Sequence, residues 1–160
     1  MATVYRAHDR RLDRTVALKL MHVHLADSPD FVSRFRREAR AAARLSNPGV
    51  VAVYDQGSLD GVAYLVMEYV ARGTLLDFIN RRLREQRAIF SFKVSMTSIA
   101  VAPFTEAEAR LYTAELALAL EFVQRECGAI YRDLKAENVL IGRDGHVRLS
   151  DFSHVKLCRS

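Results

Sequence analysis

Cysteine is scarce in this chain of 160 residues, which contains only Cys127 and Cys158. Two cysteines at this spacing form neither a disulfide framework nor a set of metal ligands, and they fit a reducing compartment. Long apolar runs are also missing. No stretch reaches the ~18 consecutive apolar residues of a membrane span, and the first residues lack the apolar run of a signal peptide. The sequence therefore predicts a soluble, cytoplasmic protein without a membrane segment.

The charge of the chain is moderately basic, with a net charge of +5 and a pI near 9.5. There is no block of like charge, and basic residues do not alternate with aromatic ones, so no nucleic acid is expected as a partner. Hydrophobic residues make up 50% of the sequence. That share, at this length, predicts a globular fold with a real core rather than disorder.

Residues 130–138, together with Asp151, hold the side chains that phosphoryl transfer requires. Lys135 follows Asp133 by two positions, Asn138 comes three residues later, and Asp151 lies across a short hairpin. Catalysis of this reaction rests mostly on positioning and on neutralising phosphate charge. Asp133 is predicted to accept the proton of an attacking hydroxyl, and Lys135 to neutralise charge on the transferred group. Asn138 and Asp151 are predicted to hold magnesium.

The pattern R-D-L-K-x-x-N followed by D-F-x resembles the loops of eukaryotic-type (Hanks-type) serine/threonine protein kinases. The family has His where this chain has Tyr131, a variant similar to the AGC group, and Gly where it has Ser153. The resemblance implies an α+β, bilobal protein kinase-like fold. Its antiparallel β N-lobe with one helix would span residues 1–70, and a partial, mainly helical C-lobe would span 71–160. ATP and Mg²⁺ would be the cofactors, and Ser/Thr hydroxyls of proteins the acceptors.

The same resemblance assigns the nucleotide-binding residues. Residues 16–19 resemble the family's V-A-I-K strand, in which Lys19 contacts the ATP phosphates and Glu38 on the next helix pairs with it. Taken alone, Glu38 would equally suit ion pairs with neighbouring arginines. Met67 resembles the gatekeeper, and Asp77 is expected near the ribose. Adenine contacts are expected from Val4, Ala17, Glu68, Val70 and Leu140.

Local patterns predict the elements that carry these residues. Strands are expected over 4–6, 15–20, 50–54, 62–67, 139–141 and 146–149, with Asp-Gly turns closing two hairpins. Helices are expected to begin at residues 28–30, at 73–75 and at a capping box over 104–108. The last helix should end at Cys127-Gly128 and bury one face with Leu111, Ala114, Leu118 and Phe122. His146 and His154 are interpreted as surface residues.

The two halves of the chain resemble different kinases. Residues before 89 are most similar to bacterial serine/threonine kinases, and those from Phe104 to the AGC group, with an unassigned insertion near 89–102. Most of the glycine-rich loop and the activation segment are expected to be absent, so weak or no activity is expected of the isolated chain. A pseudokinase-like nucleotide-binding or interaction fragment is an alternative. A kinase-like phosphotransferase of small molecules is another, although R-D-L-K favours protein substrates.

Overall fold

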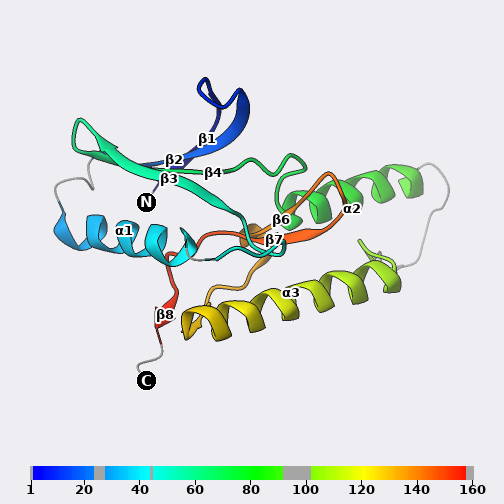
Figure 1. The fold of residues 1–160 in the computed structure, drawn as a ribbon. Coiled ribbons are helices and arrows are strands. Elements are labelled where there is room, and N and C mark those ends of the chain that lie inside the picture. The colour runs from blue at the N-terminus through cyan, green and yellow to red at the C-terminus, as the bar shows by residue number, and fades with distance from the viewer. Residues whose placement is uncertain (1, 24–27, 44, 92–101, 158–160) are drawn as a thin grey trace.

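A computed structural model describes residues 2–23, 28–43, 45–91 and 102–157 of the chain, in an α+β arrangement (Figure 1). Three long helices accompany a sheet of four strands and several shorter elements. In chain order the elements are β1 (Ala2–Asp9), β2 (Arg14–Met21), α1 (Pro29–Ala43), β3 (Val53–Leu59), β4 (Val62–Glu68), α2 (Leu75–Ser91), α3 (Glu106–Cys127), β5 (Ala129–Ile130), the 3₁₀ helix η2 (Ala136–Asn138), β6 (Val139–Ile141), β7 (Val147–Leu149) and β8 (Lys156–Leu157).

The first four strands form one antiparallel sheet in the order β1-β2-β4-β3. The β3–β4 hairpin turns at Asp60 and Gly61, whose φ angles of 49° and 79° are both positive, as the Asp-Gly pair predicts. Helix α1 covers one face of this sheet (Figure 1). Its buried Phe35 packs with Met21 and Leu65, which are buried in the sheet. The predicted start of α1 is confirmed, and the helix ends at Ala43.

The predicted strand over 50–54 is wrong in position, because β3 begins at Val53 and continues to Leu59. Val50 belongs instead to the core around β7, and Val51 is joined to β7 through its backbone. Val51 donates a backbone hydrogen bond to Leu149 at 2.9 Å, and Leu149 donates one to Gly49 at 2.8 Å. The apolar run at 50–54 is therefore divided between two packing partners, a division that local periodicity does not reveal.

Helix α3 begins with the predicted capping box, in which Thr105 and Glu108 each accept a hydrogen bond from the other's backbone N–H. Gly128 ends the helix in the left-handed conformation, with φ of 54°. The predicted buried face is wrong in part, since Leu118 is 65% exposed while Val123 is 1% exposed. The residues that pack inward include Tyr112, Leu116, Ala119 and Phe122, and those left exposed include Leu111 and Ala114. Two neighbouring stripes of α3 are apolar, so the helical period alone could not choose between them.

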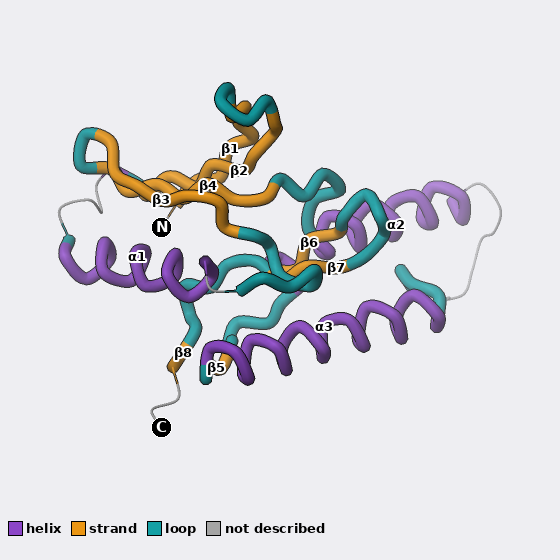
Figure 2. Tube along the Cα trace, viewed as in Figure 1, coloured by secondary structure: helices purple, strands orange, loops and turns teal. Residues whose placement is uncertain are grey.

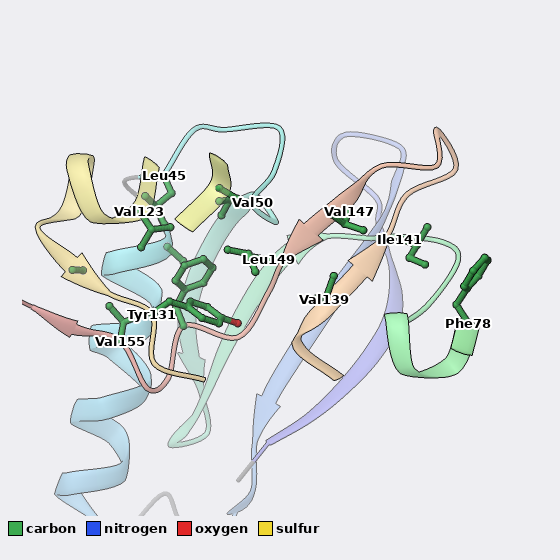
Figure 3. Close-up of a cluster of buried hydrophobic side chains, with 14 residues drawn as sticks. Leu45, Val50, Phe78, Val123, Tyr131, Val139, Ile141, Val147, Leu149 and Val155 are labelled. Atoms are coloured by element: carbon green, nitrogen blue, oxygen red, sulfur yellow. The ribbon is translucent and has the colours of Figure 1, made fainter. Parts of the chain in front are cut away.

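The largest core lies between α3, α2 and the β6–β7 hairpin (Figure 3). Ile141 and Leu149 from the hairpin have no exposed surface, and Val123 of α3 belongs to the same buried cluster. The hairpin lies between the four-stranded sheet and α3 (Figure 2). Its backbone is attached to the residues that precede α2, since Ile141 donates a hydrogen bond to Gly73 at 3.0 Å. This packing fixes where the polar ends of the hairpin lie.

The α+β fold class is confirmed. Of the unassigned segment near 89–102, residues 89–91 form the end of α2, and residues 92–101 lie outside the described part of the chain. Among the helices that the structure describes, none combines the length and the apolar character that crossing a bilayer requires.

Candidate functional site

A cleft of about 730 Å³ opens between the four-stranded sheet and the segment that contains η2 and Asp151. Its walls come from β1, β2, the end of β4 and the residues that follow it, helix α1 and residues 132–154. Seven of the predicted nucleotide-binding residues line it, together with both predicted magnesium ligands: Val4, Ala17, Lys19, Met67, Glu68, Val70, Leu140, Asn138 and Asp151. Segments far apart in the sequence therefore meet at one cavity.

Lys19 reaches into this cleft from the middle of β2, where its backbone pairs with Val4 and Leu65 of the neighbouring strands. Its side chain is only 12% exposed, and Nζ lies 3.2 Å from Oδ1 of Asp151. Glu38, the predicted partner of Lys19, lies on α1, but its side chain is outside the described part of the chain. The Lys19–Glu38 pair therefore stays a prediction.

Asp151 is held in the left-handed region with φ of 57°, which is unfavourable for a residue with a Cβ. Burial raises the pKa of its carboxyl, but the charge of Lys19 and the hydrogen bonds from Ser153 outweigh burial and lower that pKa. All these donors contact Oδ1. Within the described residues no group donates to Oδ2, so one oxygen of a charged carboxylate stays open.

Asp133, like Asp151, is held through only one of its two carboxylate oxygens. Its Oδ2 accepts hydrogen bonds from Lys135 Nζ at 2.9 Å and from Asn138 Nδ2 at 2.8 Å. The hydrogen bond from Lys135 lowers the pKa of Asp133; burial acts in the opposite direction, and Asn138 adds to the lowering. Asp133 is therefore ionised at neutral pH. Its other oxygen, Oδ1, has no donor among the described residues.

Asn138 connects the two carboxylate regions. It is 5% exposed, and its Nδ2 donates to both the backbone oxygen and Oδ2 of Asp133. The backbone carbonyl of Asn138 accepts hydrogen bonds from the N–H and the hydroxyl of Ser150 at 2.9 and 3.0 Å. Both hydrogen bonds of Nδ2 go to Asp133, and no described residue donates to the side-chain Oδ1 of Asn138, which is a residue of the cleft.

Tyr131, which stands where the family has His, is a structural connection between the two loops. It is 3% exposed, its hydroxyl donates to the backbone oxygen of Ser150, and its ring lies edge-on to Phe152 at 5.4 Å. The next residue, Arg132, donates from Nε to the backbone oxygen of His154 at 2.9 Å. The Asp133 segment and the Asp151 segment therefore form one connected unit.

His154 is a cleft residue that the sequence analysis missed. Its side chain is 53% exposed, as a surface residue would be, but Nδ1 lies 3.4 Å from Oδ2 of Asp133 and the residue lines the cleft. The contact spans 21 positions in the sequence, and no local pattern signals it. His146, by contrast, lies away from the cleft and contacts Glu115 of α3.

Glu68, the last residue of β4, has both its backbone N–H and its carboxylate engaged within the protein. The N–H of Glu68 donates to Ala52 at 2.8 Å, and its carboxylate lies 3.5 Å from Arg148 Nε. Asp77 accepts hydrogen bonds from the N–H and hydroxyl of Thr74 at 3.0 and 2.7 Å and so caps α2; its expected place near a ribose stays a prediction. The capping hydrogen bonds from Thr74 lower the pKa of Asp77.

A family model described as protein kinase domain matches residues 1–160 of the sequence. The chain belongs to the protein kinase domain family. The probable serine/threonine-protein kinase pknA2 of Bifidobacterium longum is 43% identical over 159 residues, which are 98% of this chain and 18% of that protein. PknL of Mycobacterium tuberculosis is 42% identical over 97% of this chain and 34% of its own length. PrkC of Bacillus subtilis is 34% identical over 95% of this chain and 20% of its own length.

This kinase-family chain thus spans between 18% and 34% of the length of these three relatives. The similarity to bacterial kinases extends over both halves, including the half for which a resemblance to the AGC group was noted. Membership of the protein kinase domain family, which the R-D-L-K-x-x-N pattern predicts, is confirmed.

Proposed function

We propose that this site transfers the γ-phosphate of ATP to serine or threonine hydroxyls of proteins. The observation that supports the proposal best is a set of three open side-chain oxygens, two on the cleft residues Asn138 and Asp151 and one on Asp133, which is hydrogen-bonded to Asn138. Asp133 Oδ1, Asn138 Oδ1 and Asp151 Oδ2 accept no hydrogen bond from the described residues, while the other end of each side chain is held firmly. The names of the relatives, all serine/threonine-protein kinases, support the same class of acceptor.

The open oxygens of Asn138 and Asp151 fit magnesium, which prefers hard oxygen ligands and uses one or two protein carboxylates beside phosphate and water. Within the described residues, no group of three or more His, Cys, Asp or Glu side chains could hold a metal alone. The remaining ligands would therefore come from the nucleotide and from water. When bound, the ion would neutralise charge on the phosphates.

The other end of the cleft suits a nucleotide base. Ala17, Met67 and Val70 give it an apolar wall, and Val4 and Leu140 lie on the same cleft. Since the N–H of Glu68 is used by Ala52, the Glu68 carbonyl and the Val70 backbone are the groups proposed to bind adenine. Lys19 would then bind the phosphates. ATP is a cytoplasmic metabolite, so we place the activity in the cytoplasm.

In the proposed reaction the acceptor hydroxyl oxygen forms a bond to the γ-phosphorus as the bond to ADP breaks. Asp133 accepts the hydroxyl proton at its open oxygen. Its lowered pKa keeps it charged before the reaction, so it also orients the hydroxyl through a charge-assisted hydrogen bond. Lys135, 2.9 Å from Asp133, would neutralise charge on the transferred phosphoryl group.

The direct test is transfer of radiolabelled phosphate from ATP to a protein rich in serine and threonine. Asp133→Asn should reduce the rate by ~10²–10⁴. Asp60→Asn is the matched control, because residue 60 lies in a turn with φ of 49°, which asparagine tolerates. An Asp133→Asn rate equal to that of the wild type would remove Asp133 from this role.

A second candidate function is a non-catalytic, pseudokinase-like nucleotide-binding or interaction module. The observation that favours it is the contact of 3.2 Å between Lys19 and Asp151, which joins the group proposed for the phosphates to the one proposed for the cation. Nucleotide binding without any phosphate transfer to serine, threonine or tyrosine substrates would support this candidate over the first.

A further inference from the structure

We propose that Ser153 is a positioning residue for Asp151, and that its hydroxyl holds Asp151 Oδ1 so that Oδ2 stays directed at the cation. The inference rests on the proposed function and adds to it a residue at the position where the family has glycine. The structure supports it through contacts at one carboxylate oxygen and through the way Ser153 itself is held. The exchange of partners that the proposed function requires of Lys19 is a further reason.

Ser153 contacts Asp151 twice. The Ser153 hydroxyl donates to Asp151 Oδ1, and its backbone N–H lies 3.3 Å from the same oxygen. A glycine at position 153 could supply only the second of these hydrogen bonds. Because both donors contact one oxygen, they fix the rotation of the carboxylate rather than only its charge. The other oxygen is left for a ligand.

Ser153 is well placed to do this because its neighbours on both sides are anchored. Phe152 is 4% exposed and packs against Tyr131. His154 is attached through its carbonyl, which accepts a hydrogen bond from Arg132 Nε at 2.9 Å. The positive φ of the segment occurs at Asp151, at 57°, and not at Ser153, so serine fits this position without backbone strain. Its hydroxyl is therefore preorganised.

Lys19 is the other donor to Asp151 Oδ1, and it comes from the opposite wall of the cleft. Under the proposed function Lys19 binds the phosphates, which draws its ammonium away from Asp151. Ser153 is two residues from Asp151 in the chain, and the proposed function requires no other contact of it. It would therefore keep the carboxylate oriented while the nucleotide is bound.

The test is calorimetric titration of the full chain with ADP, once with magnesium chloride and once with EDTA, for the wild type, Ser153→Ala and Ser153→Thr. Loss of one charge-assisted hydrogen bond should weaken magnesium-dependent ADP binding by about tenfold in Ser153→Ala. ADP binding in EDTA should be unchanged, and Ser153→Thr, which keeps a hydroxyl, should bind like the wild type. Raising the magnesium concentration should restore ADP affinity in Ser153→Ala, an effect that a general loss of structure would not produce.

Ser46→Ala is the matched control, since Ser46 is an exposed loop serine away from the cleft. Equal magnesium dependence in Ser153→Ala and the wild type would overturn the inference and leave the proposed function standing. So would an equal loss in Ser153→Ala and Ser153→Thr, or a loss of the same size in EDTA. A folded wild-type chain that binds no ADP with magnesium would overturn both proposals.

Discussion

The ion pair between Arg82 of α2 and Glu108 of α3 should make a measurable contribution to stability. Its two hydrogen bonds, Nη1 to Oε2 and Nη2 to Oε1, are each 2.8 Å long. Arg82 also donates to the carbonyl of Pro103 at 3.2 Å, and its guanidinium carbon lies 4.5 Å from the centre of the Phe78 ring. The pair joins α2 to the start of α3, which flank residues 92–101 in the sequence.

The size of the contribution follows from the titration of Glu108. The hydrogen bonds from Arg82, followed by that from the Thr105 backbone, lower the pKa of Glu108 from 4.5 to about 2. Full conversion of this shift would give about 3 kcal/mol. The side chains of Arg82 and Glu108 are 33% and 28% exposed, so solvent screening reduces the figure, and we expect about 1–2 kcal/mol of coupling. Because the folded pKa is lowered, this stability is present above pH 4.5 and is lost as the pH falls towards about 2.

The assay is a double-mutant cycle on the free energy of unfolding in urea, with Arg82→Met, Glu108→Gln and both together. The Glu106–Arg110 pair on α3 is the control, because its side chains are 78% and 79% exposed. Its coupling should be no more than about 0.5 kcal/mol. An Arg82–Glu108 coupling energy no larger than that of the control pair would refute this account. So would a coupling energy that stays constant as the pH falls from 4.5 towards about 2.

Three further predictions concern other parts of the fold. The contact with Glu115 raises the pKa of His146, so the stability that this contact adds is present below pH 6.5 and is lost as the pH rises through the folded pKa. The free energies of unfolding in urea of the wild type and His146→Asn should therefore differ at acidic pH and converge at alkaline pH, and a difference that stays constant with pH would contradict this. Leu149→Ala on β7 should cost about 2–5 kcal/mol in urea unfolding because Leu149 is fully buried, and Leu118→Ala on α3 only about 0.5 kcal/mol because Leu118 is exposed; a Leu118→Ala cost as large as that of Leu149→Ala would mean that the rotation of α3 is misassigned. Gly145→Ala should cost about 1 kcal/mol, because Gly145 has φ of 84° although a methyl group would have room; no loss in thermal unfolding would argue against this backbone conformation.

Features set by neighbouring residues could be predicted from the sequence. The Asp60-Gly61 turn needs positive φ at both positions, and the Thr105–Glu108 capping box satisfies its hydrogen bonds within four residues. Both are as predicted, because no distant partner is needed to decide them. The Asp133 segment was identified by resemblance, and the two lobe boundaries and the roles of its residues stay predictions.

Features decided by packing between distant segments could not be predicted. The sequence does not reveal that Val51 pairs with Leu149, nor that Val123 of α3 is buried while Leu118 is exposed. It also gives no sign that His154 lies beside Asp133, or that Arg82 meets Glu108. Each contact depends on how helices and hairpins pack, and residues of the same type on a neighbouring face would give the same pattern.

The central claim, that the cleft binds ATP with magnesium, is tested most directly by calorimetric titration of ATP into the purified chain. The wild type should bind ATP, and magnesium should strengthen the binding. Lys19→Ala and Asp151→Asn should each weaken it, the first through the phosphates and the second through the cation. A folded chain that binds no ATP, or that binds it equally well in both variants and without magnesium, would contradict the account.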